Sequence, residues 1–287
     1  MSGSVLRIGS GQLAFDGGAP APWKRADSRL PRVTLAQAIE AQIVPRLVVR
    51  RGAPSVIAPQ SGAPALTAVG QDVVELAELA MRGDEPAMRI RMQDAAARQG
   101  LDSVCLDLLA PAARYLGALW EEDLCSFTDV TLGMMQLQAS LHMITVGAQE
   151  SPTEGFRRHR IALAAAPWEH HRFGLSMVGT FFRKAGWSVT TLDDSTLPDL
   201  AALLRREWFG VLGISVGSEQ RLERLAAVLP LLRDVSRNAS LSVLVGGPIF
   251  VAHPELAGQI GADGTATDGV QSVWVAENLL AERSNSG

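Results

Sequence analysis

Histidine and cysteine, two residue types that often bind metals, are scarce in this 287-residue sequence. It has five histidines and two cysteines, Cys105 and Cys125, and these cysteines form no CxxC pair or other zinc-binding spacing. Both cysteines lie in segments with a helical pattern, where a free cysteine usually packs as a small apolar side chain. These features argue against a disulfide framework and favour the reducing cytoplasm as the location of the protein.

Positive charge and long apolar runs are also lacking. The formal net charge is −4, whereas surfaces that bind nucleic acids are normally basic, so we expect no direct binding to DNA. The first 15 residues lack the apolar core of a signal peptide. The most apolar long stretch, residues 130–147, contains Gln136, Gln138 and His142 and does not fit a membrane span. We therefore expect no membrane association.

The residue pattern predicts three regions. Residues 1–69 are rich in Gly, Pro, Ser and Ala and predict a flexible leader with one short helix near 34–44. Residues 70–148 show helical spacing, with a first helix from about residue 70, others at 85–99 and 101–120, and a fourth beginning near Ser126. Ser126 and Asp129 have the spacing of a capping box, with Asp in place of Glu. This region predicts an N-terminal four-helix bundle.

Residues 158–285 alternate between apolar runs and amphipathic segments. The runs at 160–166, 187–193, 210–216, 241–247 and 263–267 are each followed by a segment with helical spacing. This alternation predicts an α/β domain with a five-stranded parallel sheet, of the Rossmann-like or flavodoxin-like type. Ligands of such sheets bind beyond the carboxyl ends of the strands, so we expect the site there.

Small residues and a pair of histidines, His170 and His171, follow these strands. Taken singly, such residues are explained by tight turns and helix caps. Taken together, they predict a floor on which a large flat ligand can lie. The residues concerned are Glu169, His170, His171 and Gly174 after the first strand, Ser215, Val216 and Gly217 after the third, Gly246 and Gly247 after the fourth, and Asp268 and Gly269 after the fifth.

The stretch Glu169-x-His171-x-x-Gly174, together with the later Ser and Gly-Gly segments, resembles the cobalamin-binding domain family. The first motif of that family is Asp-x-His-x-x-Gly, so this chain departs from it by Glu169. The resemblance implies that His171 is the lower ligand of cobalt and that Glu169 fixes its imidazole by a hydrogen bond. It also implies that the later residues line the cofactor pocket, namely Gly174, Ser215, Val216, Gly217, Gly246, Gly247, Asp268 and Gly269.

Two alternatives to this assignment stay open. His170 is the other candidate ligand, but adjacent residues of an extended segment point in opposite directions, so both histidines are not expected to bind one metal. His171 can also be an ordinary loop histidine.

Residues 114–138 resemble the helical bundle that covers the cofactor in light-sensing B12 regulators such as CarH and in methionine synthases. This resemblance implies that Trp120 covers the upper face of cobalt. In CarH, nine residues separate the Trp from a Glu-His pair, whereas this chain has Val130 and Thr131 at the aligned positions. The alternative for Trp120 is ordinary core packing.

The narrower pattern W-x-x-D-x-x-S-F-x-D-V-T-x-G, residues 120–133, resembles the AerR/PpaA group of photosynthesis regulators, which is related to the C-terminal part of AppA. The resemblance implies a cobalamin-binding light or redox sensor that acts as an antirepressor on a CrtJ/PpsR-type repressor. It implies hydroxo-, methyl- or adenosylcobalamin as cofactor, with haem as the alternative, and contacts from Trp120, Phe127, Val130 and Thr131.

We expect no enzyme activity, because the chain has no substrate-barrel domain of the kind that B12 mutases and methyltransferases need. Two other functions remain possible from the sequence. One is a corrinoid carrier protein that serves a separate methyltransferase, and the other is a haem-binding redox sensor.

Overall fold

The computed structural model describes residues 69–145, 159–166, 172–192 and 196–285. All of these residues belong to one unit, Val56–Gly287. Within the described ranges, no helix combines the length and the apolarity that crossing a membrane requires. The predicted leader of residues 1–69 lies almost wholly outside the described residues, and the predicted domain boundaries stay predictions.

Residues 71–145 form a run of helical segments. Amphipathic spacing places side chains such as Leu76, Met88, Leu109 and Leu116 in one buried cluster, which joins the segments. The segments are α3 (Gln71–Arg82), α4 (Glu85–Ser103), the π-helix η3 (Val104–Leu109), α5 (Ala110–Glu121) and α6 (Phe127–Thr145).

Gly100 interrupts the segment labelled α4. Its backbone has φ 81° and ψ 164°, a conformation outside the helical region that a side chain would oppose. The residues before and after Gly100 are therefore separate helical stretches, in agreement with the predicted ranges of 85–99 and 101–120. The π-helix that follows was not predicted, because its one-residue insertion into the helical hydrogen-bond pattern leaves no mark in the apolar spacing.

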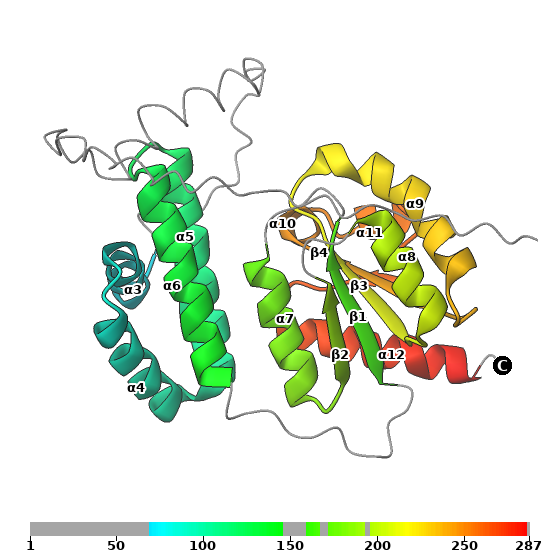
Figure 1. The fold of residues 1–287 in the computed structure, drawn as a ribbon, viewed down its shortest axis with the longest axis horizontal. Coiled ribbons are helices and arrows are strands. Elements are labelled where there is room, and N and C mark those ends of the chain that lie inside the picture. Colours follow the sequence, from blue (N-terminus) through cyan, green and yellow to red (C-terminus); the bar gives the residue numbers. More distant parts are fainter. Residues whose placement is uncertain (1–68, 146–158, 167–171, 193–195, 286–287) are drawn as a thin grey trace, which may run out of the picture. The chain divides into compact units, whose positions relative to one another are not determined.

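The C-terminal half is built on a five-stranded parallel sheet with the order β2-β1-β3-β4-β5 (Figure 1). The predicted five-stranded, flavodoxin-like parallel sheet is thereby confirmed. Both faces of the sheet are covered, so the central strands β1, β3 and β4 each have four consecutive buried residues rather than an alternation of buried and exposed ones. The strands are β1 (Arg160–Ala165), β2 (Ser188–Leu192), β3 (Val211–Ser215), β4 (Ser242–Gly246) and β5 (Gly264–Thr265).

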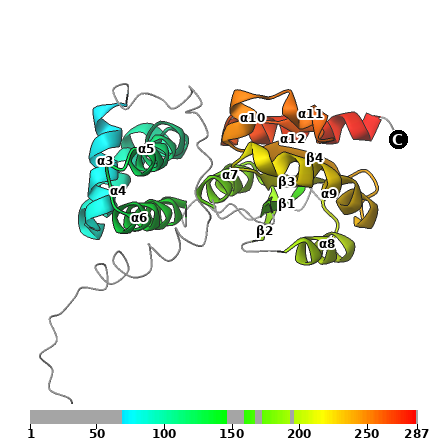
Figure 2. The same cartoon turned by 90° about the horizontal axis from the view of Figure 1, so that it is seen from above.

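Helices pack on both faces of this sheet, as Figures 1 and 2 show. On one face, Leu175 and Phe182 of α7 and Ala276 of α12 share a buried cluster with β1, β3 and β4. The other face is covered by the remaining helices. The helices are α7 (Phe173–Lys184), α8 (Leu197–Arg206), the 3₁₀ turn η4 (Glu219–Arg221), α9 (Leu222–Val235), α10 (Pro248–Ala252), α11 (Leu256–Gln259) and α12 (Gly269–Asn285).

Helix α7 is apolar on two sides. Leu175 and Phe182 face the sheet, while Phe173, Met177 and Phe181 belong to the buried cluster of the helical segments 71–145. A helix with two apolar sides must be buried on both, and α7 accordingly contributes to both cores.

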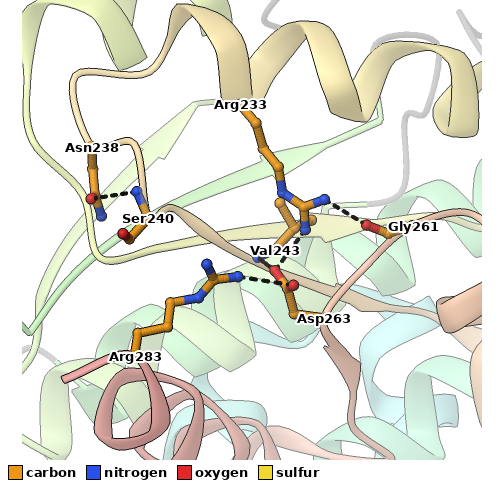
Figure 3. Close-up of polar contacts among 7 residues, drawn as sticks. All are labelled: Arg233, Asn238, Ser240, Val243, Gly261, Asp263 and Arg283. Carbon is orange, nitrogen blue, oxygen red and sulfur yellow. Dashed lines mark hydrogen bonds and ion pairs between the residues drawn. The ribbon is translucent and has the colours of Figure 1, made fainter. Parts of the chain in front are cut away.

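Asp263 ties the beginning of β5 to its neighbours, as Figure 3 shows. Its carboxylate accepts hydrogen bonds from Arg233 Nη2 at 2.6 Å, Arg283 Nη2 at 2.9 Å and the backbone N–H of Val243 at 2.6 Å. Arg233 Nη1 also donates to the carbonyl of Gly261 at 2.8 Å. The segment Gly261-Ala262-Asp263 therefore orders the amino-terminal edge of the sheet, away from the edge where the ligand is expected.

Candidate functional site

The carboxyl ends of β1, β3 and β4 lie side by side. Ala165 is in register with Ser215, and Ser215 with Gly246. The pairing continues one residue further, because Ala166 N donates to the carbonyl of Ser215 and Val216 N donates to the carbonyl of Gly246, each at 2.9 Å. The chain leaves β1 toward α7 on one face of the sheet and leaves β3 toward α9 on the other. A parallel sheet of this strand order binds ligands at this edge.

The fold thus brings together the predicted residues Ser215, Val216, Gly246 and Gly247, although they are up to 32 positions apart in the sequence. Gly217 follows Val216 directly and is exposed.

The two neighbouring glycines after β4 differ in their surroundings. Gly247 has φ +123°, and a Cβ atom there would collide with the carbonyl oxygen of Val216. Gly247 is therefore required by the close approach of two backbones. Gly246 has nothing within 4 Å of the position a Cβ would take. Gly246 therefore leaves open space at the ligand edge, which a cofactor can fill.

The proposed cobalt ligand lies outside the described residues, as do Glu169 and His170. The flanking residues fix where this segment begins and ends: Ala166 follows β1, and α7 begins at Phe173, two positions after His171. Gly174 lies in the first turn of α7 and is exposed, and a Cβ on its backbone would have no neighbouring atom within 4 Å. Like Gly246, it leaves room beside the expected site.

Asp268 and Gly269, predicted to line the pocket, have structural partners. Asp268 Oδ1 accepts a hydrogen bond from Gln271 N at 2.8 Å, and its carbonyl accepts one from Ser272 N at 3.0 Å. Asp268 therefore caps the beginning of α12. Gly269 is buried, and a Cβ there would collide with the ring of Phe181. Its lack of a side chain allows α12 to approach α7.

Trp120 and Phe127 form an exposed aromatic pair. Their ring centroids are 5.9 Å apart and the ring planes meet at 67°, an edge-to-face geometry. Trp120 is 42% exposed and Phe127 is 46% exposed. Ordinary core packing, the alternative for Trp120, does not describe a side chain this exposed.

Val130 and Thr131, at the positions of the Glu-His pair of CarH, differ in how far their side chains are buried. Val130 is partly buried and packs against the cluster of the helical segments. Thr131 is exposed and lies one helical turn after Phe127 on α6. The sequence predicted cofactor contacts for both, but only Thr131 shares the exposed side of α6 with Phe127.

The predicted capping box at the start of α6 is confirmed. Asp129 Oδ2 accepts hydrogen bonds from Ser126 N at 3.0 Å and from Ser126 Oγ at 2.8 Å, while Asp129 N donates to Ser126 Oγ at 3.1 Å. Further along α6, a Cβ at Gly133 would lie 2.8 Å from Leu116 Cδ1 of α5. Gly133 therefore permits close packing of α5 on α6. Four residues of the pattern S-F-x-D-V-T-x-G, residues 126–133, therefore have structural roles in capping or packing α6. They are Ser126, Asp129, Val130 and Gly133.

Two features of the turn between α5 and α6 were not predicted from the sequence. Leu124 is 63% exposed, which adds an exposed apolar side chain to the segment between Trp120 and Phe127. Asp123 has φ 55°, in the left-handed region that few residues other than Gly adopt. Asp is among the few residues other than Gly that tolerate this conformation.

Neither cysteine is a ready metal ligand. Burial raises the pKa of the Cys105 thiol to about 12, with a further contribution from Asp102. Burial and the charge of Asp129 also raise the pKa of Cys125. Since the thiolate is the ligand form, both side chains are protonated near neutral pH. Within the part of the chain that the structure describes, no group of three His, Cys, Asp or Glu side chains could hold a metal ion.

The described residues fit a large flat cofactor. Gly246 and Gly174 leave open space at the carboxyl edge, and the exposed pair Trp120 and Phe127 offers apolar surface of the kind that covers a macrocycle.

Comparison with known proteins decides which cofactor domain this is. Residues 159–273 match the family model of the B12 binding domain. This part of the chain is similar to B12-binding domains. The match begins just before β1 and ends within α12, so it covers the whole parallel sheet.

A curated relative extends this similarity. The chain is 28% identical over 173 residues to an uncharacterized 20.5 kDa protein in the bchF-crtJ intergenic region of Rhodobacter capsulatus, which covers 60% of this chain and 90% of the relative. Together with the B12-binding domain, this likeness confirms the resemblance found in the sequence and is consistent with an AerR-type cobalamin-binding protein.

One solved structure supports the fold. The Methanosarcina barkeri monomethylamine corrinoid protein matches with a TM-score of 0.56 at 16% identity, over 72% of this chain and 96% of that chain. A cobalamin-binding protein from Desulfitobacterium hafniense DCB-2 matches with a TM-score of 0.39 at 17% identity, over 72% of this chain and 98% of that chain. The first of these supports a shared fold for the B12-binding domain.

Proposed function

We propose that this protein is a cobalamin-dependent light or redox sensor that regulates transcription as an antirepressor and catalyses no reaction itself. The B12-binding domain holds the cofactor at the carboxyl edge of its sheet. The helices of residues 71–145, as the predicted four-helix bundle, cover the upper face of the cofactor. The observation that carries the proposal is a B12-binding domain combined with the exposed pair Trp120 and Phe127.

The roles of individual residues follow from their chemistry. His171 would hold cobalt through a neutral imidazole, and Glu169 would accept a hydrogen bond from its other ring nitrogen. Gly246 leaves room for the cofactor, while the aromatic pair excludes water from its upper face. When bound, cobalamin supplies a bond between cobalt and its upper ligand that light or a redox change can break.

The regulatory part of the proposal concerns a protein partner. We propose a CrtJ/PpsR-type repressor, with no direct binding to DNA by this chain. Two observations support this choice: the resemblance of residues 120–133 to the AerR/PpaA group, and the relative whose gene lies beside crtJ. The net charge of −4 agrees with a regulator that acts through another protein.

Absorption spectra test the ligand assignment. The full-length chain is incubated with hydroxocobalamin in the dark, freed of unbound cofactor and scanned. We expect retained cofactor whose bands differ from those of free hydroxocobalamin, with loss or shift of those bands in His171→Ala and little change in His170→Ala. The opposite pattern would move the ligand to His170, and a Soret band after incubation with haem alone would favour the haem sensor.

Binding to the repressor tests the regulatory role. A purified CrtJ/PpsR-type repressor is combined with the cobalamin-loaded chain in the dark and after illumination, and its affinity for promoter DNA is measured. We expect the loaded chain to weaken DNA binding by the repressor in one of the two states. A chain that leaves the repressor unaffected but accepts a methyl group from a methyltransferase would instead be a corrinoid carrier.

A further inference from the structure

The connection between α5 and α6 is short and internally bonded. We call residues 122–126 the α5–α6 turn. Within it, Glu122 N donates to the carbonyl of Ala118 at 3.0 Å, and Leu124 N donates to the carbonyl of Leu119 at 2.8 Å. These bonds fold the turn back onto the last turn of α5, the one that carries Trp120.

The other end of the turn is held by the capping box. Asp129 accepts hydrogen bonds from both the backbone N–H and the hydroxyl of Ser126, and its own N–H donates to that hydroxyl. Phe127 is the first residue of α6, directly after Ser126. The capping box therefore fixes the backbone from which the Phe127 ring projects.

Both rings are only partly buried, with Trp120 42% exposed and Phe127 46% exposed. Core packing therefore fixes them less firmly than a fully buried ring, and the backbone beneath them contributes to their geometry. The left-handed Asp123, with φ 55°, is one constraint on that backbone, and the capping box is the other.

We infer that Ser126 and Asp129 are positioning residues for the cofactor site: they hold Phe127 against Trp120, so that the two rings form a preformed cover for the upper face of the cobalamin. This inference rests on the proposed function and adds a role for two residues that touch no cofactor themselves. Preorganisation lowers the cost of ordering a binding surface, so the capping box contributes to cofactor affinity as well as to helix stability.

The chain contains a matched control for this idea. At the start of α8, Thr196 and Asp199 form a capping box with the same three hydrogen bonds between the same atoms. Helix α8 follows β2, an edge strand of the sheet, and carries none of the predicted site residues. Removing either carboxylate takes away the same kind of cap, but only Asp129 supports the aromatic pair.

The experiment compares full-length wild type, Asp129→Ala, Asp129→Glu and Asp199→Ala. Each is titrated with hydroxocobalamin, and its visible spectrum and thermal unfolding midpoint are recorded. We expect Asp129→Ala to weaken cofactor binding about five- to tenfold, from the usual worth of one cap, and to shift the bands toward those of free cofactor. Asp129→Glu restores the usual capping box and should restore both readouts. Asp199→Ala should lower the midpoint with wild-type binding and spectrum.

Two results would overturn the inference: wild-type affinity and bands in Asp129→Ala, or equal weakening by Asp129→Ala and Asp199→Ala, which would mark a general effect of stability. If Asp129→Ala does not fold, Ser126→Ala removes only the hydroxyl and keeps the bond from Ser126 N to the carboxylate, and a smaller loss of affinity is expected. A wild type that binds no cobalamin would instead reject the proposed function, which separates the two failures.

Discussion

At the scale of single residues, the neighbouring glycines after β4 separate a folding role from a binding role. Gly247→Ala places a Cβ against the carbonyl oxygen of Val216 at φ +123°, so we expect the free energy of unfolding to fall by at least about 2 kcal/mol. Gly246→Ala meets open space, so we expect its stability to change by less than about 1 kcal/mol while cobalamin binding weakens. Urea unfolding and cobalamin titration of both variants check this.

Equal loss of stability in the two glycine variants would contradict the structure of this turn. Unchanged cobalamin binding in Gly246→Ala would show that the open space beside this residue is not used by the cofactor.

The two cysteines offer a second test at the same scale. Burial raises the pKa of Cys105 to about 12, whereas Cys125 is partly exposed and its pKa is raised by burial and by Asp129. We expect a thiol reagent at pH 8 to modify Cys125 slowly in the native protein and to reach Cys105 only after denaturation. Mass spectrometry of the labelled peptides gives the order, and prompt native labelling of Cys105 would contradict its buried position.

At the scale of elements, α8 has a carboxylate with a lowered pKa near each end. Hydrogen bonds from Thr196 lower the pKa of Asp199, and hydrogen bonds from Arg206 and Arg160 lower the pKa of Glu207. A lowered pKa in the folded state means that the unfolded chain binds more protons at acid pH. The stabilisation is therefore complete above the ordinary values of 3.8 and 4.5 and is lost as the pH falls through the lower, folded values.

We accordingly expect the unfolding midpoint of the wild type to drop as the pH falls below about 4.5, and to drop less steeply over that range in Asp199→Asn and Glu207→Gln. Thermal unfolding at a series of pH values measures this. Parallel curves for wild type and variants would show that these groups do not contribute to the acid dependence.

Elements also show what the sequence could and could not predict. Apolar runs of strand length, each followed by helical spacing, predicted all five strands within a few residues, because burial on both faces of a parallel sheet demands such runs. The short helix α10 was missed: its five residues directly follow the Gly-Gly turn and are too few to show a period. The helical spacing predicted after the fourth apolar run corresponds to α11.

The same limits apply to the candidate site. Residues after β3 and β4 could be predicted to meet, since the carboxyl ends of parallel strands share one edge. The capping box could be predicted because it is local. The exposure of Trp120, Phe127 and Leu124 could not, since a helix pattern says which side is apolar and not what covers it. Asp268 was predicted to line the pocket, but its bond to Gln271 N depends on the geometry of one turn.

At the scale of the whole molecule, α7 links the two cores. Met177 is 5% exposed and packs in the cluster of the helical segments, while Phe182 of the same helix packs against the sheet. We therefore expect one cooperative unfolding transition, with equal calorimetric and van't Hoff enthalpies. Met177→Ala should lower the free energy of unfolding by about 2–4 kcal/mol and keep a single transition.

Two separate transitions in the wild type would contradict this coupling. So would a Met177→Ala variant in which only the helical segments lose stability, because a shared helix transmits the loss to both cores.

The central claim is that this chain binds cobalamin through its B12-binding domain. The most direct measurement is the absorption spectrum of the full-length protein after incubation with hydroxocobalamin in the dark and gel filtration. We predict one equivalent of cofactor in the protein peak, with bands shifted from those of free hydroxocobalamin. A colourless protein peak, with all the cofactor eluting at the free position, would contradict the account.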